Sequence, residues 1–68
     1  MAISVVRSLV ASSRKGWDDA VEQGLARARK TVRGITEIEV MSETARVEEG
    51  RITDFHVKLK IRFVLDEV

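Results

Sequence analysis

The sequence predicts an α+β domain in which a three-stranded antiparallel sheet packs on one amphipathic helix, in the order strand, helix, strand, strand. Two patterns carry this prediction. Between residues 14 and 33, apolar residues recur at spacings of three and four, which is the period of one helix face. On either side, at residues 1–11, 35–47 and 55–65, apolar residues fall on alternate positions, which is typical of strands.

The first strand is expected at Met1–Ala11. Because successive side chains of a strand point to opposite sides, its apolar residues divide into two sets, and Arg7 interrupts the larger one. The larger set is Ile3, Val5 and Leu9, and the smaller set is Val6 and Val10.

The helix is expected at Arg14–Arg33, directly after Ser12 and Ser13, whose hydroxyls can accept hydrogen bonds from the unpaired amides of a first helical turn. Acidic residues gather near its start and basic residues near its end, an order that suits the helix dipole. Gly34 is well placed to end it. The apolar stripe of this helix consists of Trp17, Ala20, Val21, Gly24, Leu25, Ala28 and Val32.

The last two strands are expected to form a hairpin around the loop Glu48–Arg51, which contains the glycine that a tight turn needs. If Val47 pairs with Ile52, one register aligns apolar with apolar residues and acids with bases, and a slip by one residue would bury charges. In this register Glu43 faces His56, Glu39 faces Lys60, Glu37 faces Arg62, Val40 meets Leu59 and Ile38 meets Ile61.

The size of the chain favours self-association. A chain of 68 residues forms at most one domain, and such a domain buries only about 60% of the surface that its unfolded chain exposes. Disulfides or a metal often supply the missing stability. The absence of Cys excludes disulfides and zinc–thiolate sites, and one His excludes a His-rich metal centre. An oligomer is the remedy that remains.

Composition also limits the classes of function. Twelve basic and eleven acidic residues give a formal net charge of +1, which argues against nucleic acid as a partner. The apolar stretch near the N-terminus is short and contains Arg7, so we expect neither a signal peptide nor a membrane span, and the default location is cytoplasmic. No Ser–His–Asp constellation or Gly-rich phosphate loop is recognisable, so we expect no enzyme.

The residues resemble those of the dodecins over nearly the whole chain, and the run from Gly24 to Thr31 is the most distinctive part. The resemblance implies one dodecin-like domain over residues 1–68, a hollow shell of twelve copies, and a flavin (FMN or riboflavin) bound between subunits. The matching residues are Ser12, Ser13, Gly16, Gly24, Leu25, Ala26, Arg27, Ala28, Lys30, Thr31, Glu39, Val40, Phe63, Leu65 and Asp66.

The flavin contacts of the family are altered in this chain. Flavin-binding dodecins carry a Trp, whose indole stacks on the flavin, two residues before the Glu-Val pair; here that position is Glu37. A second contact in the family is a Gln on the last strand, and here it is His56. The expected ligand-binding residues are therefore Glu37 and His56, supported by Arg62 and Glu43. A carboxylate offers no π-face, so flavin stacking of the usual kind is not expected.

Several alternatives remain open. Glu37 and Glu39 are candidate ligands for Ca²⁺, which some dodecin-like chains without the Trp are associated with, but salt bridges suit them better, because Lys60 and Arg62 already neutralise them. Trp17 fits core or interface packing better than flavin binding. The basic helix end is read as a solvated face or a phosphate contact. The leading hypothesis is a dodecameric binding or storage protein, and the alternatives are a purely structural shell, a calcium-binding dodecin and a nucleic-acid accessory protein.

Overall fold

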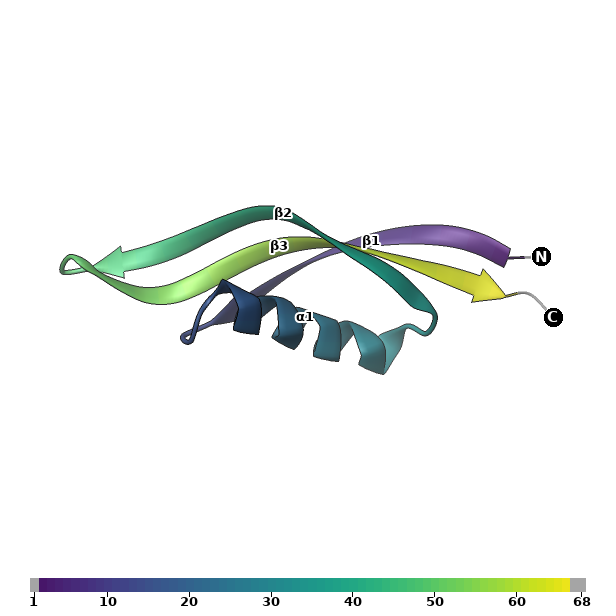
Figure 1. The fold of residues 1–68 in the computed structure, drawn as a ribbon, viewed down its shortest axis with the longest axis horizontal. Helices are drawn as coiled ribbons and strands as arrows, with labels where there is room; N and C mark the ends of the chain where they lie inside the picture. The colour runs from purple at the N-terminus through teal and green to yellow at the C-terminus, as the bar shows by residue number, and fades with distance from the viewer. Residues whose placement is uncertain (1, 67–68) are drawn as a thin grey trace.

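Three long strands and one helix make up the computed structural model, which describes residues 2–66 (Figure 1). The strands form one antiparallel sheet in the order β1-β3-β2, so β3 lies in the middle. This topology confirms the predicted fold class, and the expected start of the first strand at Met1 lies outside the described residues. The elements are β1 (Ala2–Ser13), α1 (Trp17–Thr31), β2 (Ile35–Glu48) and β3 (Arg51–Asp66).

The helix covers only the middle of one face of the sheet (Figure 1). The protomer is 54 Å long, whereas the 15 residues of α1 span about 22 Å at 1.5 Å per residue. Both ends of the sheet therefore extend beyond the helix. Within residues 2–66, no helix has the length and apolar composition needed to cross a membrane.

The core forms where α1 meets β3. Gly24 allows the close approach, because a Cβ atom at this position would lie 2.6 Å from the Cδ1 atom of Leu59. Ala20 and Ala28 stand one helical turn before and after it, so the buried stripe of the helix is made of small residues. This agrees with the apolar stripe expected for the helix. The buried apolar residues are Ala11, Ala20, Ala28, Val57, Leu59, Ile61 and Phe63.

The helix is shorter than the predicted range Arg14–Arg33. At its start, the strand β1 extends to Ser13 and the helix begins only at Trp17. Ser13 pairs with Phe55 in the β-ladder, so the expected serine N-cap is wrong. Gly16 takes that position, and no side chain caps the helix. At the other end, the backbone of Val32 is already extended, so the helix ends at Thr31, two residues before the predicted end at Arg33.

The hairpin is confirmed at its turn and at both ends of its register. Glu49 and Gly50 have φ angles of 52° and 75°, which are the positive values of a two-residue type I′ turn. The pairs confirmed are Val47–Ile52, Val40–Leu59, Glu39–Lys60, Ile38–Ile61 and Glu37–Arg62.

The middle of the hairpin corrects the predicted register. Met41 is an extra residue in β2 and Thr53 an extra residue in β3, so the pairing between them is shifted by one position. Glu43 therefore lies opposite Val57, and His56 lies opposite Thr44. The expected Glu43–His56 pair is wrong.

Candidate functional site

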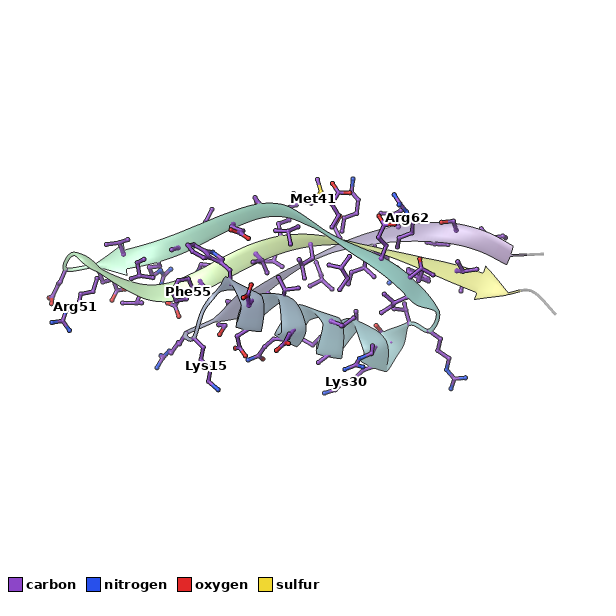
Figure 2. All side chains as sticks on the ribbon, viewed as in Figure 1. Lys15, Lys30, Met41, Arg51, Phe55 and Arg62 are labelled. Carbon is purple, nitrogen blue, oxygen red and sulfur yellow. The ribbon has the colours of Figure 1, made fainter. Side chains whose placement is uncertain are left out.

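The face of the sheet opposite the helix carries most of the predicted site residues. We call it the polar sheet face. Figure 2 shows Arg62 and Met41 on this side, away from α1. Alternation along β3 places His56, Lys58 and Lys60 on the same face as Arg62. This face is cationic along β3, with acidic residues beside it on β2.

An ion pair joins the two predicted site residues Glu37 and Arg62. The Arg62 Nη1 atom donates to the Glu37 Oε1 atom at 3.1 Å. The two side chains are 58% and 44% exposed, so water screens the pair and its contribution to stability is about 0–1 kcal/mol. The ion pair therefore orients the Glu37 carboxylate at the surface but contributes little to the stability of the fold.

His56 and Glu43 do not join this pair within one protomer. His56 lies six residues before Arg62 on β3, which is about 20 Å at 3.3 Å per residue. It lies between Thr44 on β2 and Ser12 on β1. Glu43 shares the face of the buried Val57, because residues directly opposite each other point to the same side.

The two expected metal ligands lie close together, but two carboxylates are too few for a calcium site. Glu37 and Glu39 are two residues apart on the polar sheet face, and Lys60 lies opposite Glu39. Along residues 2–66, no group of three or more His, Cys, Asp or Glu side chains is arranged to hold a metal ion. A cation bound here would need further oxygen ligands from other copies of the chain.

Trp17 packs on the helix side of the sheet, which agrees with the packing interpretation. Its ring lies edge-on to Phe55, with centroids 4.9 Å apart and an interplanar angle of 77°. Its Nε1–H donates to the carbonyl of Thr44 at 3.1 Å. Because Thr44 belongs to the edge strand β2, this contact covers a carbonyl on an open edge of the sheet.

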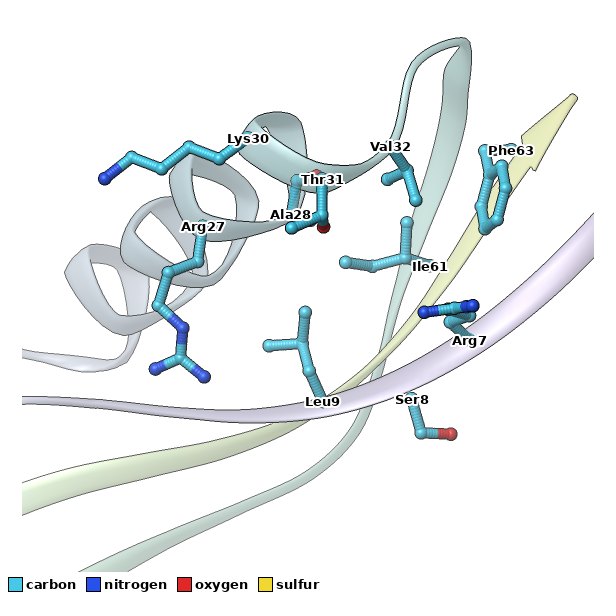
Figure 3. A pocket seen from close by; sticks show the side chains of 10 residues that line it. All are labelled: Arg7, Ser8, Leu9, Arg27, Ala28, Lys30, Thr31, Val32, Ile61 and Phe63. Carbon is cyan, nitrogen blue, oxygen red and sulfur yellow. The ribbon is translucent and has the colours of Figure 1, made fainter. Parts of the chain in front are cut away.

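A cavity of about 380 Å³ lies beside the C-terminal half of α1, against β1 (Figure 3). Arg7, Arg27 and Lys30 line it together with apolar side chains. Sequence reasoning missed this grouping, because it treated Arg7 as an interruption of the strand and the basic helix end, separately, as a solvated face or a phosphate contact. The available signal was a cation at position 7 on the helix side of the strand.

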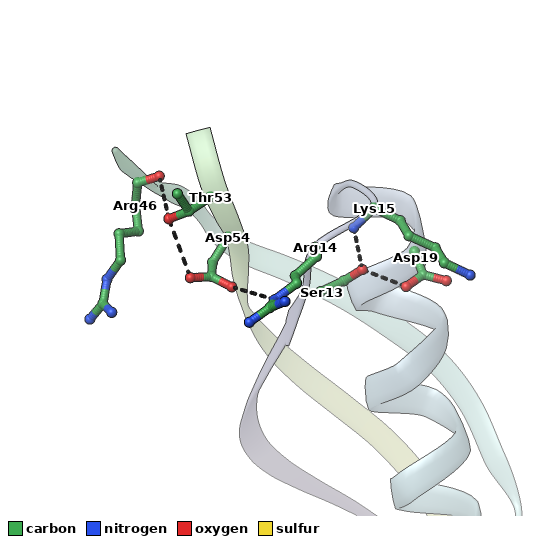
Figure 4. Close-up of polar contacts among 7 residues, drawn as sticks. All are labelled: Ser13, Arg14, Lys15, Asp19, Arg46, Thr53 and Asp54. Atoms are coloured by element: carbon green, nitrogen blue, oxygen red, sulfur yellow. Dashed lines mark hydrogen bonds and ion pairs between the residues drawn. The ribbon is translucent and has the colours of Figure 1, made fainter. Parts of the chain in front are cut away.

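Polar contacts hold the loop between β1 and α1 (Figure 4). The Ser13 Oγ atom accepts from the Lys15 N–H at 2.9 Å and donates to the Asp19 Oδ2 atom at 2.5 Å. Gln23 also donates to this carboxylate, at 3.2 Å. These hydrogen bonds, with that of Ser13 foremost, lower the pKa of Asp19 below its ordinary value of 3.8.

We expect Asp19→Asn to destabilise the protein at neutral pH and to have a smaller effect in acid. A carboxyl whose pKa is lowered by folding stabilises the protein above its ordinary value, here 3.8, and this contribution is lost as the pH falls through the lowered value. The midpoint of thermal unfolding, measured for both proteins across this range, tests the effect. A difference that stays constant with pH would show that the charge of Asp19 plays no part.

The comparisons with known proteins agree on one family. The family model described as Dodecin matches residues 4–66. A curated dodecin from Thermus thermophilus is 36% identical over 59 residues, which cover 87% of this chain and 86% of that protein. The solved structure of dodecin from Streptomyces davaonensis superposes with a TM-score of 0.91 at 30% identity, covering 97% of each chain.

A third relative is described by the ion that it binds. The calcium dodecin of Mycobacterium tuberculosis, described as calcium-chelating and as having a calcium-binding site, has a TM-score of 0.79 and 26% identity. The match covers 90% of this chain and 87% of that one. With a family model spanning nearly all described residues and a relative above one-third identity, the chain belongs to the Dodecin family.

Proposed function

We propose that residues 1–68 form one domain, that twelve copies assemble into a closed shell, and that the shell binds or stores a small ligand at its subunit interfaces without catalysing a reaction. One observation carries this proposal: large apolar side chains stay more than 40% exposed in the protomer. Such surface is costly in water, and a small domain gains by burying it against other copies. The exposed residues are Ile3, Val6, Val10, Val40, Met41, Val47, Ile52 and Leu65.

The polar sheet face is the proposed ligand surface. Arg62 offers N–H donors in a planar fork, which suits carboxylate or phosphate groups of a ligand. Glu37 accepts hydrogen bonds but cannot stack on an aromatic ring. A flavin would therefore bind here through polar contacts alone, with His56 contributed by a neighbouring subunit, since the 20 Å or so along β3 separates it from Arg62 in one protomer.

Calcium is the second candidate ligand, and the likeness to the calcium dodecin favours it. Ca²⁺ takes six to eight oxygen ligands. Glu37 and Glu39 supply two carboxylates from one protomer, so the proposed site needs several copies around a symmetry axis. A bound Ca²⁺ would compete with Arg62 for the Glu37 carboxylate. The Arg62 Nη1 atom lies 3.1 Å from the Glu37 Oε1 atom.

Native mass spectrometry on protein purified without added ligand tests the assembly and the ligand together. We expect a species of about twelve times the 7.7 kDa protomer mass, with extra mass that identifies a flavin, calcium or another compound. A monomer at micromolar concentration would contradict the assembly. A bare dodecamer that takes up neither riboflavin nor Ca²⁺ on titration would favour the purely structural shell.

A further inference from the structure

The cavity beside α1 has an apolar floor. Leu9 of β1 and Ile61 of β3 form its base, and Ala28 closes it on the helix side (Figure 3). The cavity lies against β1, which is an edge strand of the sheet. We call it the α1–β1 groove. Its volume of about 380 Å³ is enough for a few side chains of another chain.

Three cations line this groove, and the part of the chain that the structure describes contributes no carboxylate to its lining. Figure 3 shows Arg7 and Arg27 at opposite ends of the apolar floor, with Lys30 on the helix above. The Arg27 Nη2 atom donates to the carbonyl of Val10 at 3.3 Å, a neutral partner. The ion pairs among residues 2–66 are Arg14–Asp54 and Glu37–Arg62, so none of these described residues gives the cations of the groove an acidic partner.

The turn of the hairpin has the complementary composition. We call residues 47–52 the hairpin tip. Val47 and Ile52 lie opposite each other and are 59% and 53% exposed. Glu48 lies opposite Arg51 on the neighbouring strand. Glu49 lies in the tight turn itself, with a positive φ of 52°. The tip therefore presents apolar side chains with an acid at its point.

The tip and the groove of one chain cannot meet. Arg51 is ten residues from Ile61 on β3, a separation of about 33 Å along an extended strand. Figure 1 shows the hairpin turn at the end of the sheet that lies beyond the start of α1. A tip can contact a groove only between copies of the chain, so each protomer would contribute its tip to one copy and accept the tip of another in its groove.

We propose that the hairpin tip of one subunit docks in the α1–β1 groove of a second copy of this chain. Glu49 then faces the cations of Arg7, Arg27 and Lys30, while the apolar residues of the tip cover the floor of the groove. Such a contact is heterologous, because different patches meet, and heterologous contacts close into rings when the rotation permits. This inference rests on the self-assembly proposed above and adds which surfaces meet.

Disulfide trapping tests the contact directly, because the chain has no Cys of its own. In the variant carrying Lys30→Cys and Glu49→Cys, mild oxidation is expected to link subunits into a ladder of covalent oligomers on a non-reducing gel. The matched control carries Asp18→Cys and Glu49→Cys, with the helix cysteine at the opposite end of α1 from Lys30. Equal ladders from both variants, or none from either in an assembled protein, would overturn the docking.

Charge reversal provides an independent test that also reports on folding. We expect Glu49→Lys alone, and Arg7→Glu with Lys30→Glu, each to raise the protein concentration at half-assembly at least tenfold in sedimentation velocity. Combining all three changes is expected to restore assembly, because the charges are exchanged across the contact. Glu22→Lys, an exposed helix position with the same change of charge, is the control expected to leave assembly unchanged. Failure of the combined variant to recover would overturn the docking, provided that its circular dichroism spectrum is that of a folded protein and each parent variant had lost assembly.

Two further outcomes separate this inference from the proposed function. A wild-type protein that stays monomeric would overturn both, whereas an assembled protein indifferent to the charge reversals would overturn the docking alone. The groove is also chemically suited to a free amphipathic anion. If the assembled wild type binds 1-anilinonaphthalene-8-sulfonate and loses this binding in Arg7→Glu with Lys30→Glu, the groove is open and the docking is wrong.

Discussion

Leu59→Ala is expected to lower the free energy of unfolding by about 2–5 kcal/mol, the usual cost of removing a large side chain from a packed core. Leu59 is fully buried in the central strand, and its Cδ1 atom lies where a side chain at Gly24 would begin. A domain of this length has a total stability of roughly 3–10 kcal/mol, on a scale of about 0.05–0.15 kcal/mol per residue. The variant is therefore expected to lose much of its stability.

Urea unfolding followed by the fluorescence of Trp17 measures this loss, because Trp17 packs on Phe55 at the edge of the same core. Wild type and variant must be compared at one protein concentration, since assembly contributes to apparent stability. Leu59→Met is the matched control: it keeps the side-chain volume and is expected to cost less than about 1.5 kcal/mol. Equal unfolding midpoints for the Ala and Met variants would show that packing at this position does not limit stability.

Glu37→Trp is expected to raise the affinity for riboflavin about tenfold or more. An aromatic stack on a flat ring contributes about 1–3 kcal/mol, and 1.4 kcal/mol corresponds to a factor of ten. The fold should tolerate the change, because Glu37 is 58% exposed and its ion pair with Arg62 contributes at most about 1 kcal/mol. Quenching of riboflavin fluorescence on titration with protein measures the affinity.

Two controls distinguish stacking from general hydrophobic binding. Glu37→Leu adds apolar surface without a π-system and is expected to gain much less affinity. Glu39→Trp places the same indole two residues along the polar sheet face, where the resemblance to flavin-binding dodecins predicts no platform. If the Glu37→Trp protein stays a dodecamer and its affinity does not change, Glu37 does not occupy the position of the family's stacking Trp.

The two residue pairs predicted for the ligand site, Glu37–Arg62 and Glu43–His56, show what a sequence pattern can and cannot predict. Glu37 and Arg62 could be paired from the sequence, because alternation and charge complementarity at that end agree with the local register. The relative positions of His56 and Glu43 could not be predicted in this way. Met41 adds one residue to β2 and Thr53 adds one to β3, so the register is shifted only between these two bulges and is the predicted one on either side of them. Both registers keep the alternation of Phe55–Leu65, so that part of the pattern contains no signal of the shift.

Sequence by itself determined the order of the elements, the buried face of β3, a hairpin loop within Glu48–Arg51, and the family, because periodicity, turn chemistry and a distinctive run of residues are local properties. Tertiary structure alone decided where the helix begins. Because Ser13 pairs with Phe55, it belongs to the sheet and cannot serve as the N-cap of the helix. The tertiary structure also decided that Arg7 and Lys30 share one groove. These features depend on contacts between segments far apart in the chain, whose energies no local pattern records.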